Sequence, residues 1–254
     1  MTIFNLYETF LLIIIKRKVF MEIYNSCKSA PHTTFIGIPV ARSTTCIKNM
    51  ETNIDLFQIT NKDKNFLEKL KNTIKMDELY PSKRIQKHEY ERWHEMLEVA
   101  VNKAFEKGRK CFVAFKENKP CGIITFEQGE KKFHLDCICT WPVEAGKKVT
   151  LAGQTLFKQM FGNFLESKAN LLDLTAILNG PFDTVSKYSK LGFKQVGGEN
   201  HLVAMRTNRS NTENTMKKLN DIILTTPIKD ADEIDLIKAC LLYTSPSPRD
   251  RQKS

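Results

Sequence analysis

The chain has 254 residues, of which 41% are hydrophobic and 27% are charged, and its formal net charge is +10. This length can bury a sizeable core in one domain with extensions or in two small domains, so the fold does not depend on disulfides. The seven cysteines and five histidines form no CxxC pair and no HExxH or similar spacing, which argues against a structural metal site and indicates a reducing, cytoplasmic setting.

The positive charge does not by itself indicate a nucleic-acid partner. In Lys-rich stretches such as residues 64–75, acidic residues (here Glu68) stand at helical spacing from the lysines, which is typical of a solvated helix face. We therefore predict that no nucleic acid is bound, since the opposite hypothesis rests only on overall basicity.

Residues 1–49 are interpreted as an N-terminal extension, either a leader or mistranslated sequence. The apolar run "FLLIII" is far shorter than the about 20 residues of a membrane-spanning helix, and the following "KRK" stands on the wrong side for a secretory signal. A peripheral anchor is the alternative, but we predict no stable membrane association. Met50 opens an alternating strand followed by a Thr60–Asp63 capping box, so we take it as the start of the protein.

From Met50 onwards, periodicity predicts the order strand, helix, helix, three strands, helix, strand, helix, strand, strand. The predicted strands are residues 54–60, 111–115, 121–128, 133–141, 170–178, 193–197 and 201–206, and the predicted helices are residues 65–74, 93–105, 149–167 and 180–192. The apolar run at 170–178 predicts a strand buried on both faces. Cys137 and Cys139 are two apart on a strand and are expected to be small buried residues on one face.

This order resembles the GNAT family of acetyl-CoA-dependent N-acetyltransferases over about residues 53–207. The stretch "YSKLGF" at residues 188–193 looks like the family's late Tyr-x-x-x-Gly-Phe signature. The resemblance implies an α+β fold with a mixed, mostly antiparallel central sheet flanked by helices, in a single domain at residues 50–207. It also implies that Tyr188 faces the sulfur of coenzyme A, where its hydroxyl would act as general acid to the departing thiolate.

The resemblance further implies a pyrophosphate loop between the fourth strand and the next helix. The family pattern is Gln/Arg-x-x-Gly-x-Gly/Ala, and its best match is Lys147, Thr150 and Ala152 in the segment "EAGKKVTLAGQTL". Backbone N–H groups at a helix start and small residues suit phosphate there. Thr150 departs from the usual Gly, which puts the tight turn in doubt, but it can cap the helix.

Acetyl-CoA is therefore expected as a cosubstrate, with the fourth strand splayed from the fifth near Cys139–Trp141. The residues expected to bind it are Cys139, Thr140, Trp141, Lys147, Lys148, Val149, Thr150, Leu151, Ala152, Gly153 and Asn179. Asn179 has two equally open roles, a hydrogen bond to the pantetheine or the N-cap of the next helix. Pro142 would end strand pairing.

An attacking primary amine must lose a proton, and the candidate bases are Asp136, Glu127 and Glu144, of which we select Asp136. The segment "HEYERWHE" at residues 88–95 is interpreted as solvated surface. The segment at residues 75–87, which in this family shapes the acceptor pocket, mixes both charges. Small amines, protein amino groups and aminoacyl-tRNA all stay open as acceptors.

The sequence thus predicts a cytoplasmic acyltransferase, an acetyl-CoA-dependent N-acetyltransferase, as a monomer or homodimer. The alternative is a catalytically silent GNAT-like binding module, with a helical C-terminal extension at residues 208–239 as a docking element. Residues 240–254 change abruptly to Ser, Pro and Arg and resemble the translated read-through of a sequencing adapter, so we exclude this tail from the fold.

Overall fold

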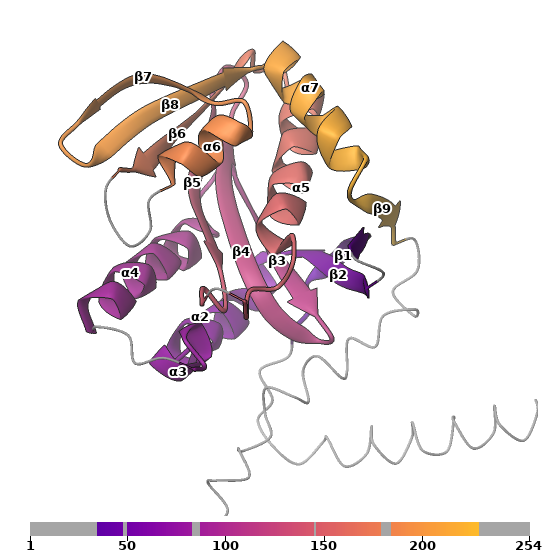
Figure 1. Cartoon of the computed structure of the whole chain (residues 1–254), viewed down its shortest axis with the longest axis vertical. Helices are drawn as coiled ribbons and strands as arrows, with labels where there is room; N and C mark the ends of the chain where they lie inside the picture. The colour runs from indigo at the N-terminus through magenta and orange to yellow at the C-terminus, as the bar shows by residue number, and fades with distance from the viewer. Residues whose placement is uncertain (1–34, 48–49, 83–86, 145, 179–183, 229–254) are drawn as a thin grey trace, which may run out of the picture. The chain divides into compact units, whose positions relative to one another are not determined.

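The computed structural model describes residues 35–47, 50–82, 87–144, 146–178 and 184–228 (Figure 1). The strands in these residues are β1 (Ile38–Ile47), β2 (Met50–Gln58), β3 (Arg109–Lys116), β4 (Lys119–Gln128), β5 (Phe133–Thr140), β6 (Leu171–Ile177), β7 (Lys194–Glu199), β8 (Leu202–Asn208) and β9 (Leu224–Pro227). The helices are the 3-10 turn η2 (Asn61–Asp63), α2 (Lys64–Thr73), α3 (Met76–Leu79), α4 (Lys87–Lys103), α5 (Ala152–Glu166), α6 (Val185–Lys190) and α7 (Arg209–Asn220).

All nine described strands belong to one sheet, in the order β7-β8-β6-β5-β4-β3-β2-β1-β9. Neighbouring strands are antiparallel except β5 and β6, which run parallel. Each predicted strand and helix has a counterpart here, and α3 adds one short turn. The predicted α+β fold with a mixed, mostly antiparallel sheet flanked by helices is confirmed.

Helices cover the sheet from both sides, and each side has its own core (Figure 1). The apolar stripe of α5 packs on one face together with α6 and α7, because Leu156, Met160 and Phe164 recur at helical spacing and are fully buried. Helices α2, α3 and α4 cover the other face, and Trp93 and Leu97 of α4 are buried there. The sheet is thus the middle layer of three.

A β-bulge in β5 changes which face its side chains reach. Thr125 of β4 pairs with Cys137 and Phe126 pairs with Leu135, so Asp136 is an extra residue without a partner on β4. Strand alternation would place Leu135 and Cys137 on the same face. Because of the extra residue, Leu135 belongs to the core beneath α5, whereas Cys137 packs against the core beneath α4.

The prediction that the strand at residues 170–178 is buried on both faces is wrong. Side chains of β6 alternate, with Leu172, Leu174 and Ala176 buried and Thr175 exposed. Leu171 exposes 42% of its surface. Only one face of β6 packs on a core, because β6 lies mainly in an antiparallel pair with β8.

The folded part of the chain extends upstream of the boundary predicted at Met50. Strand β1 pairs with β2 along its length, and Phe35 is buried against the rings of Phe57, Phe66 and Phe115. The backbone of Ile36 also donates a hydrogen bond to Asp63 (2.6 Å). Residues 38–47 are therefore part of the sheet, and Phe35 is part of its core.

The predicted helical extension at residues 208–239 contains both a helix and a strand. Helix α7 packs on α5, and β9 then returns to pair with β1. Residues 1–34 and 229–254, with the run "FLLIII" and the Ser- and Pro-rich tail, lie outside the described residues. None of the helices in the described residues has the length and apolar character needed to cross a membrane.

Candidate active site

Strands β5 and β6 part after only three paired residues. Their parallel pairing runs from Phe133 and Leu172 to Leu135 and Leu174. Beyond that point β5 continues to Thr140 paired only with β4, and β6 continues to Ile177 paired only with β8. The separation predicted for the fourth and fifth strands is therefore present.

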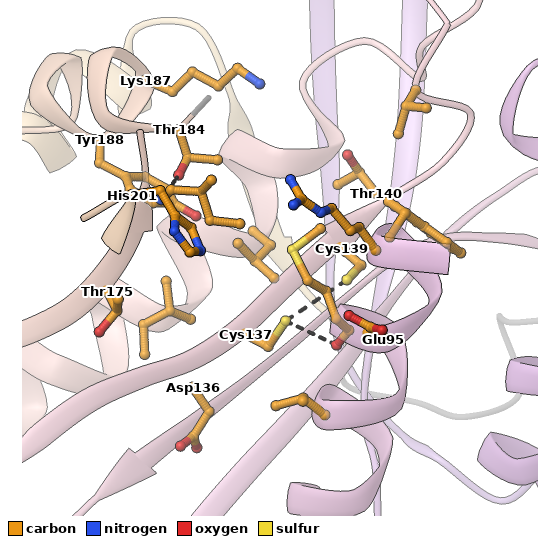
Figure 2. A pocket seen from close by; sticks show the side chains of 18 of the residues that line it. Glu95, Asp136, Cys137, Cys139, Thr140, Thr175, Thr184, Lys187, Tyr188 and His201 are labelled. Atoms are coloured by element: carbon orange, nitrogen blue, oxygen red, sulfur yellow. Dashed lines mark hydrogen bonds between the residues drawn. The ribbon is translucent and has the colours of Figure 1, made fainter. Parts of the chain in front are cut away.

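A cavity of about 630 Å³ opens where the two strands separate. Its walls come from both sides of the sheet, with α4 on one side and α6 on the other (Figure 2). The residues that line it are Tyr80, Arg92, Trp93, Glu95, Met96, Val99, Leu135, Asp136, Cys137, Ile138, Cys139, Thr140, Val143, Lys148, Thr175, Ile177, Thr184, Lys187, Tyr188 and His201. The gap in the sheet thus lets one cavity reach side chains that belong to two different cores.

Tyr188 reaches this cavity from α6 and is 9% exposed. Its ring packs edge to face on Phe157 of α5, with the ring centres 5.6 Å apart. Gly192 ends the helix at φ 88°, a conformation that suits glycine, and the N–H of Phe193 then bonds back to the carbonyl of Tyr188 (3.1 Å). The spacing of the Tyr-x-x-x-Gly-Phe motif is therefore that of a short helix with a glycine stop.

The phenol of Tyr188 is held in its protonated form. Burial raises the pKa of Tyr188 well above its ordinary value of 10.0, and a hydrogen bond with Thr184 offsets this only in part. A neutral hydroxyl at this point of the cavity can donate a hydrogen bond or a proton to a ligand.

The wall beside β5 carries two thiols. The sulfur atoms of Cys137 and Cys139 are 3.9 Å apart, and the Cys137 thiol donates to the carbonyl of Met96 on α4 (3.1 Å). The hydrogen bond with Cys137, followed by burial, raises the pKa of the Cys139 thiol. The expectation that both lie on one face is confirmed, and Figure 2 shows them next to each other.

The residues predicted to hold a cosubstrate divide into two groups. Cys139, Thr140 and Lys148 line the cavity. Trp141 is buried against Trp93, with ring centres 5.9 Å apart. The remaining predicted residues in the loop and at the start of α5, which are Lys147, Val149, Thr150, Leu151, Ala152 and Gly153, are not among the residues that line the cavity. Asn179 lies outside the described residues.

The prediction that Thr150 caps the helix is wrong. Helix α5 begins at Ala152, and its N-cap is Leu151, which adopts a left-handed conformation at φ 60°. The side chain of Thr150 is exposed. The backbone turns sharply before α5 although no glycine stands at residue 150 or 151.

Asp136 lines the cavity but is occupied by ion pairs. One carboxylate oxygen accepts a hydrogen bond from Lys103 and the other from Arg109, each at 3.0 Å. The side chain has no exposed surface. An arrangement in which both oxygens are bound to cations favours a structural role at the bulge over the role of a base.

The two other predicted bases are also engaged in structural contacts. Glu127 pairs with Lys132 (3.1 Å) and is not among the described residues that line the cavity. Glu144 is 5% exposed and accepts a hydrogen bond from the backbone N–H of Ser82 (2.8 Å).

The structure brings into the cavity side chains that the sequence analysis did not select. Arg92 and Glu95 belong to the segment interpreted as solvated surface, but both line the cavity. With Met96 and Val99 they recur at i, i+3, i+4 and i+7, so a second stripe on α4 could have indicated them. Nothing in the sequence points to His201, which comes from the turn between β7 and β8.

The described residues contain no group of three or more His, Cys, Asp or Glu side chains arranged to hold a metal ion. The side chains that line the cavity include hydroxyl, thiol, imidazole, carboxylate and cationic groups.

No family model and no curated protein sequence matches the chain. Among solved structures, the N-acetyltransferase PseH of Campylobacter jejuni is similar over 61% of this chain and 98% of its own, with 17% identity and a TM-score of 0.38. The PaiA N-acetyltransferase of Thermoplasma acidophilum, in complex with coenzyme A, is similar over 61% and 98%, with 16% identity and a TM-score of 0.45. An aminoglycoside 6'-acetyltransferase type Ii is similar over 61% and 96%, with 16% identity and a TM-score of 0.44.

The order of elements along the chain, the mixed and mostly antiparallel sheet, and the early separation of β5 and β6 are the features that the resemblance noted in the sequence predicts. From β2 to β8 the order of strands and helices along the chain is the one expected from that resemblance, and β1, α7 and β9 extend it.

Proposed function

We propose that the chain is an N-acetyltransferase that moves an acetyl group from acetyl-CoA to a primary amine of its acceptor. One observation carries the proposal. One cavity extends through the gap between β5 and β6, and the buried phenol of Tyr188 lies on its wall. Two substrates can meet in such a gap, each approaching from one face of the sheet.

The backbone beside the gap supports binding of an extended amide-bearing arm. Beyond Leu135, β5 has β4 as its only paired neighbour, so its other edge can offer N–H and C=O groups to a ligand in the manner of an added strand. The first N–H groups of α5 lack acceptors inside the helix, and among the described residues only that of Ala152 is seen to bond to a loop carbonyl, that of Val149 (3.3 Å). A helix start of this kind favours an anion. The exposed Lys147 and Lys148 just before this helix add positive charge.

The reaction follows from these positions. The neutral amine attacks the thioester carbonyl and gives up one N–H proton to a base, the C–S bond breaks, and the electron pair leaves with sulfur. Tyr188 gives its proton to this sulfur as general acid, and the phenolate regains a proton from solvent. Such proton transfer contributes typically 10²- to 10⁴-fold to the rate.

A catalytically silent binding module is the second candidate. It is favoured by the turn before α5, where Thr150 takes the place of the family's usual Gly and Leu151 adopts φ 60°. Side chains at a turn of this kind restrict the approach of a phosphate to the backbone.

Calorimetric titration with acetyl-CoA, followed by a thiol-release assay with a panel of primary amines, tests the proposal. We expect saturable heat with acetyl-CoA and thiol release that depends on the amine. Binding without release above background would support the binding module. No heat at high micromolar acetyl-CoA would overturn the proposed function.

A further inference from the structure

We propose that His201 is the general base that accepts the proton of the attacking amine. This inference rests on the proposed acetyl transfer and assigns the step that Asp136 was predicted to perform. It is carried by the position of His201 on the cavity wall and by the contacts that occupy the carboxylates selected from the sequence.

Among the described residues that line the cavity, few can accept a proton. Both oxygens of Asp136 are bound by cations, and Tyr188 is held protonated by burial. Glu95 and His201 are left as candidate acceptors on the cavity wall. The choice lies between a carboxylate on α4 and an imidazole on the β7–β8 turn.

Basicity favours the imidazole. The ordinary pKa of a histidine side chain is about 6.5 and that of a glutamate about 4.3. A general base works best when its pKa is near the working pH, because it must be both unprotonated and able to hold the proton. In its neutral form an imidazole has one ring nitrogen free to accept a proton, whichever tautomer it adopts.

The backbone fixes His201 at the end of β6. The N–H of Leu178, the residue after β6, donates a 2.8 Å hydrogen bond to the carbonyl of His201. This bond joins the β7–β8 turn to the strand that forms one side of the gap. Figure 2 shows the imidazole on the same wall as Tyr188 and Thr184, with Glu95 across the cavity on α4.

Several elements contribute charged or titratable groups to the cavity that His201 lines. Among the described residues, the other charged or titratable groups that line the cavity are Tyr80 after α3, Arg92 and Glu95 of α4, Asp136, Cys137 and Cys139 of β5, Lys148 of the loop, and Lys187 and Tyr188 of α6.

The proposed step balances without a further reactant. As the amine nitrogen bonds to the thioester carbon, its N–H proton passes to the free ring nitrogen of His201. The C–S bond breaks, sulfur takes the proton of Tyr188, and the imidazolium later returns its proton to solvent. The products are the acetamide and the free thiol.

The test compares His201→Gln with Glu95→Gln, which changes the other candidate, and with His88→Gln, which removes an exposed histidine at the start of α4. The measurements are kcat/KM as a function of pH and the Kd of acetyl-CoA for each variant. We expect His201→Gln to lose roughly 10²- to 10⁴-fold in kcat and to lose the fall in kcat/KM at acid pH. The Kd should change by less than about twofold, and the two control variants should keep the acid limb.

Chemical rescue gives a second measurement that a purely structural role would not change. Added imidazole should restore part of the rate of His201→Ala. Loss of rate with the acid limb intact, or loss of that limb in Glu95→Gln instead, would overturn the role of His201. An inactive wild type would overturn the proposed function as well, whereas an active wild type with an equally active His201→Gln would overturn this inference alone.

Discussion

The backbone N–H of Ile36 donates a 2.6 Å hydrogen bond to one carboxylate oxygen of Asp63. The other oxygen accepts hydrogen bonds from both the backbone N–H and the hydroxyl of Thr60. Asp63 is fully buried. Phe35, the residue before Ile36, packs among aromatic rings. One carboxylate therefore fixes the start of α2 and also ties down the segment that leads into β1.

Replacing Asp63 should strongly destabilise the fold. Asp63→Ala leaves three donors without their acceptor in a buried place, and we expect a loss of roughly 2–4 kcal/mol in the free energy of unfolding. Urea unfolding measures this change. Asp221→Ala removes an exposed aspartate and serves as the control. Equal stability of the two variants would contradict the structural role of Asp63.

A chain that begins at Met50 should be much less stable than one that begins at Phe35. The shorter chain lacks β1, so β2 and β9 both lose a paired neighbour. It also lacks the ring of Phe35, and the loss of a buried Phe side chain alone costs about 3–5 kcal/mol. Thermal unfolding of the two truncated chains compares them directly, and equal midpoints would mean that β1 is dispensable.

Tyr188→Phe should lower turnover while leaving the cavity intact. The ring still packs on Phe157, but the group that we propose as the acid is gone, so kcat should fall by about 10²- to 10⁴-fold. The Kd of acetyl-CoA should change little. Tyr80→Phe, which removes a phenol from another part of the same cavity, is the matched control. Turnover equal to the wild type would remove the proposed role of Tyr188.

Stability should fall between pH 9 and pH 12. Burial raises the pKa of the Cys111 thiol to about 12 and that of Cys121 to about 12, from an ordinary value of 9.0. The folded state thus keeps these protons while the unfolded chain loses them, so their contribution is complete below pH 9 and is lost as the pH rises towards 12.

The size of this effect is on the order of 1 kcal/mol for each thiol by pH 10. Urea unfolding at pH 8, 9 and 10 measures it, with a Cys111→Ala/Cys121→Ala variant as reference. We expect the wild type to lose more stability over this range than the variant. Parallel curves for the two proteins would show that the thiols ionise alike in both states.

Replacing Lys147 and Lys148 together by Ala should weaken acetyl-CoA binding in a salt-dependent way. Both side chains are exposed before α5, and two exposed ion pairs are worth about 0.4–2 kcal/mol together, or roughly 2- to 30-fold in Kd. Added salt should shrink this difference. Calorimetry at two salt concentrations checks it, with Lys131→Ala/Lys132→Ala in the β4–β5 turn as control. A Kd equal to that of the control would place the phosphates elsewhere.

The elements that could be predicted are those with a strong local pattern. The stripe of α5 and the short apolar runs of β3 and β4 depend only on residues near one another in sequence, and the structure has them at nearly the predicted bounds. The same holds for the helix that Gly192 ends after Tyr188, because a positive φ suits glycine in any fold.

The features that could not be predicted depend on partners far away in sequence. Whether a second layer covers Leu171 is decided by tertiary packing and not by the apolar character of β6. The extra residue at Asp136 carries no mark in the sequence, because a bulge is defined only by the register of the neighbouring strand. His201 reaches the cavity because β8, which follows it, pairs with β6. The residues between β6 and β8 carry no local pattern that indicates this pairing.

The pairing of β9 with β1 also has a consequence for synthesis on the ribosome. Ser43 and Thr225, which face each other in this pair, are separated by 182 positions. At about 5–20 residues per second, the first strand would wait about 10–40 s for its outer neighbour to be translated. During that time the free edge of β1 can recruit other chains, so nascent molecules stay exposed to aggregation at this edge until β9 emerges.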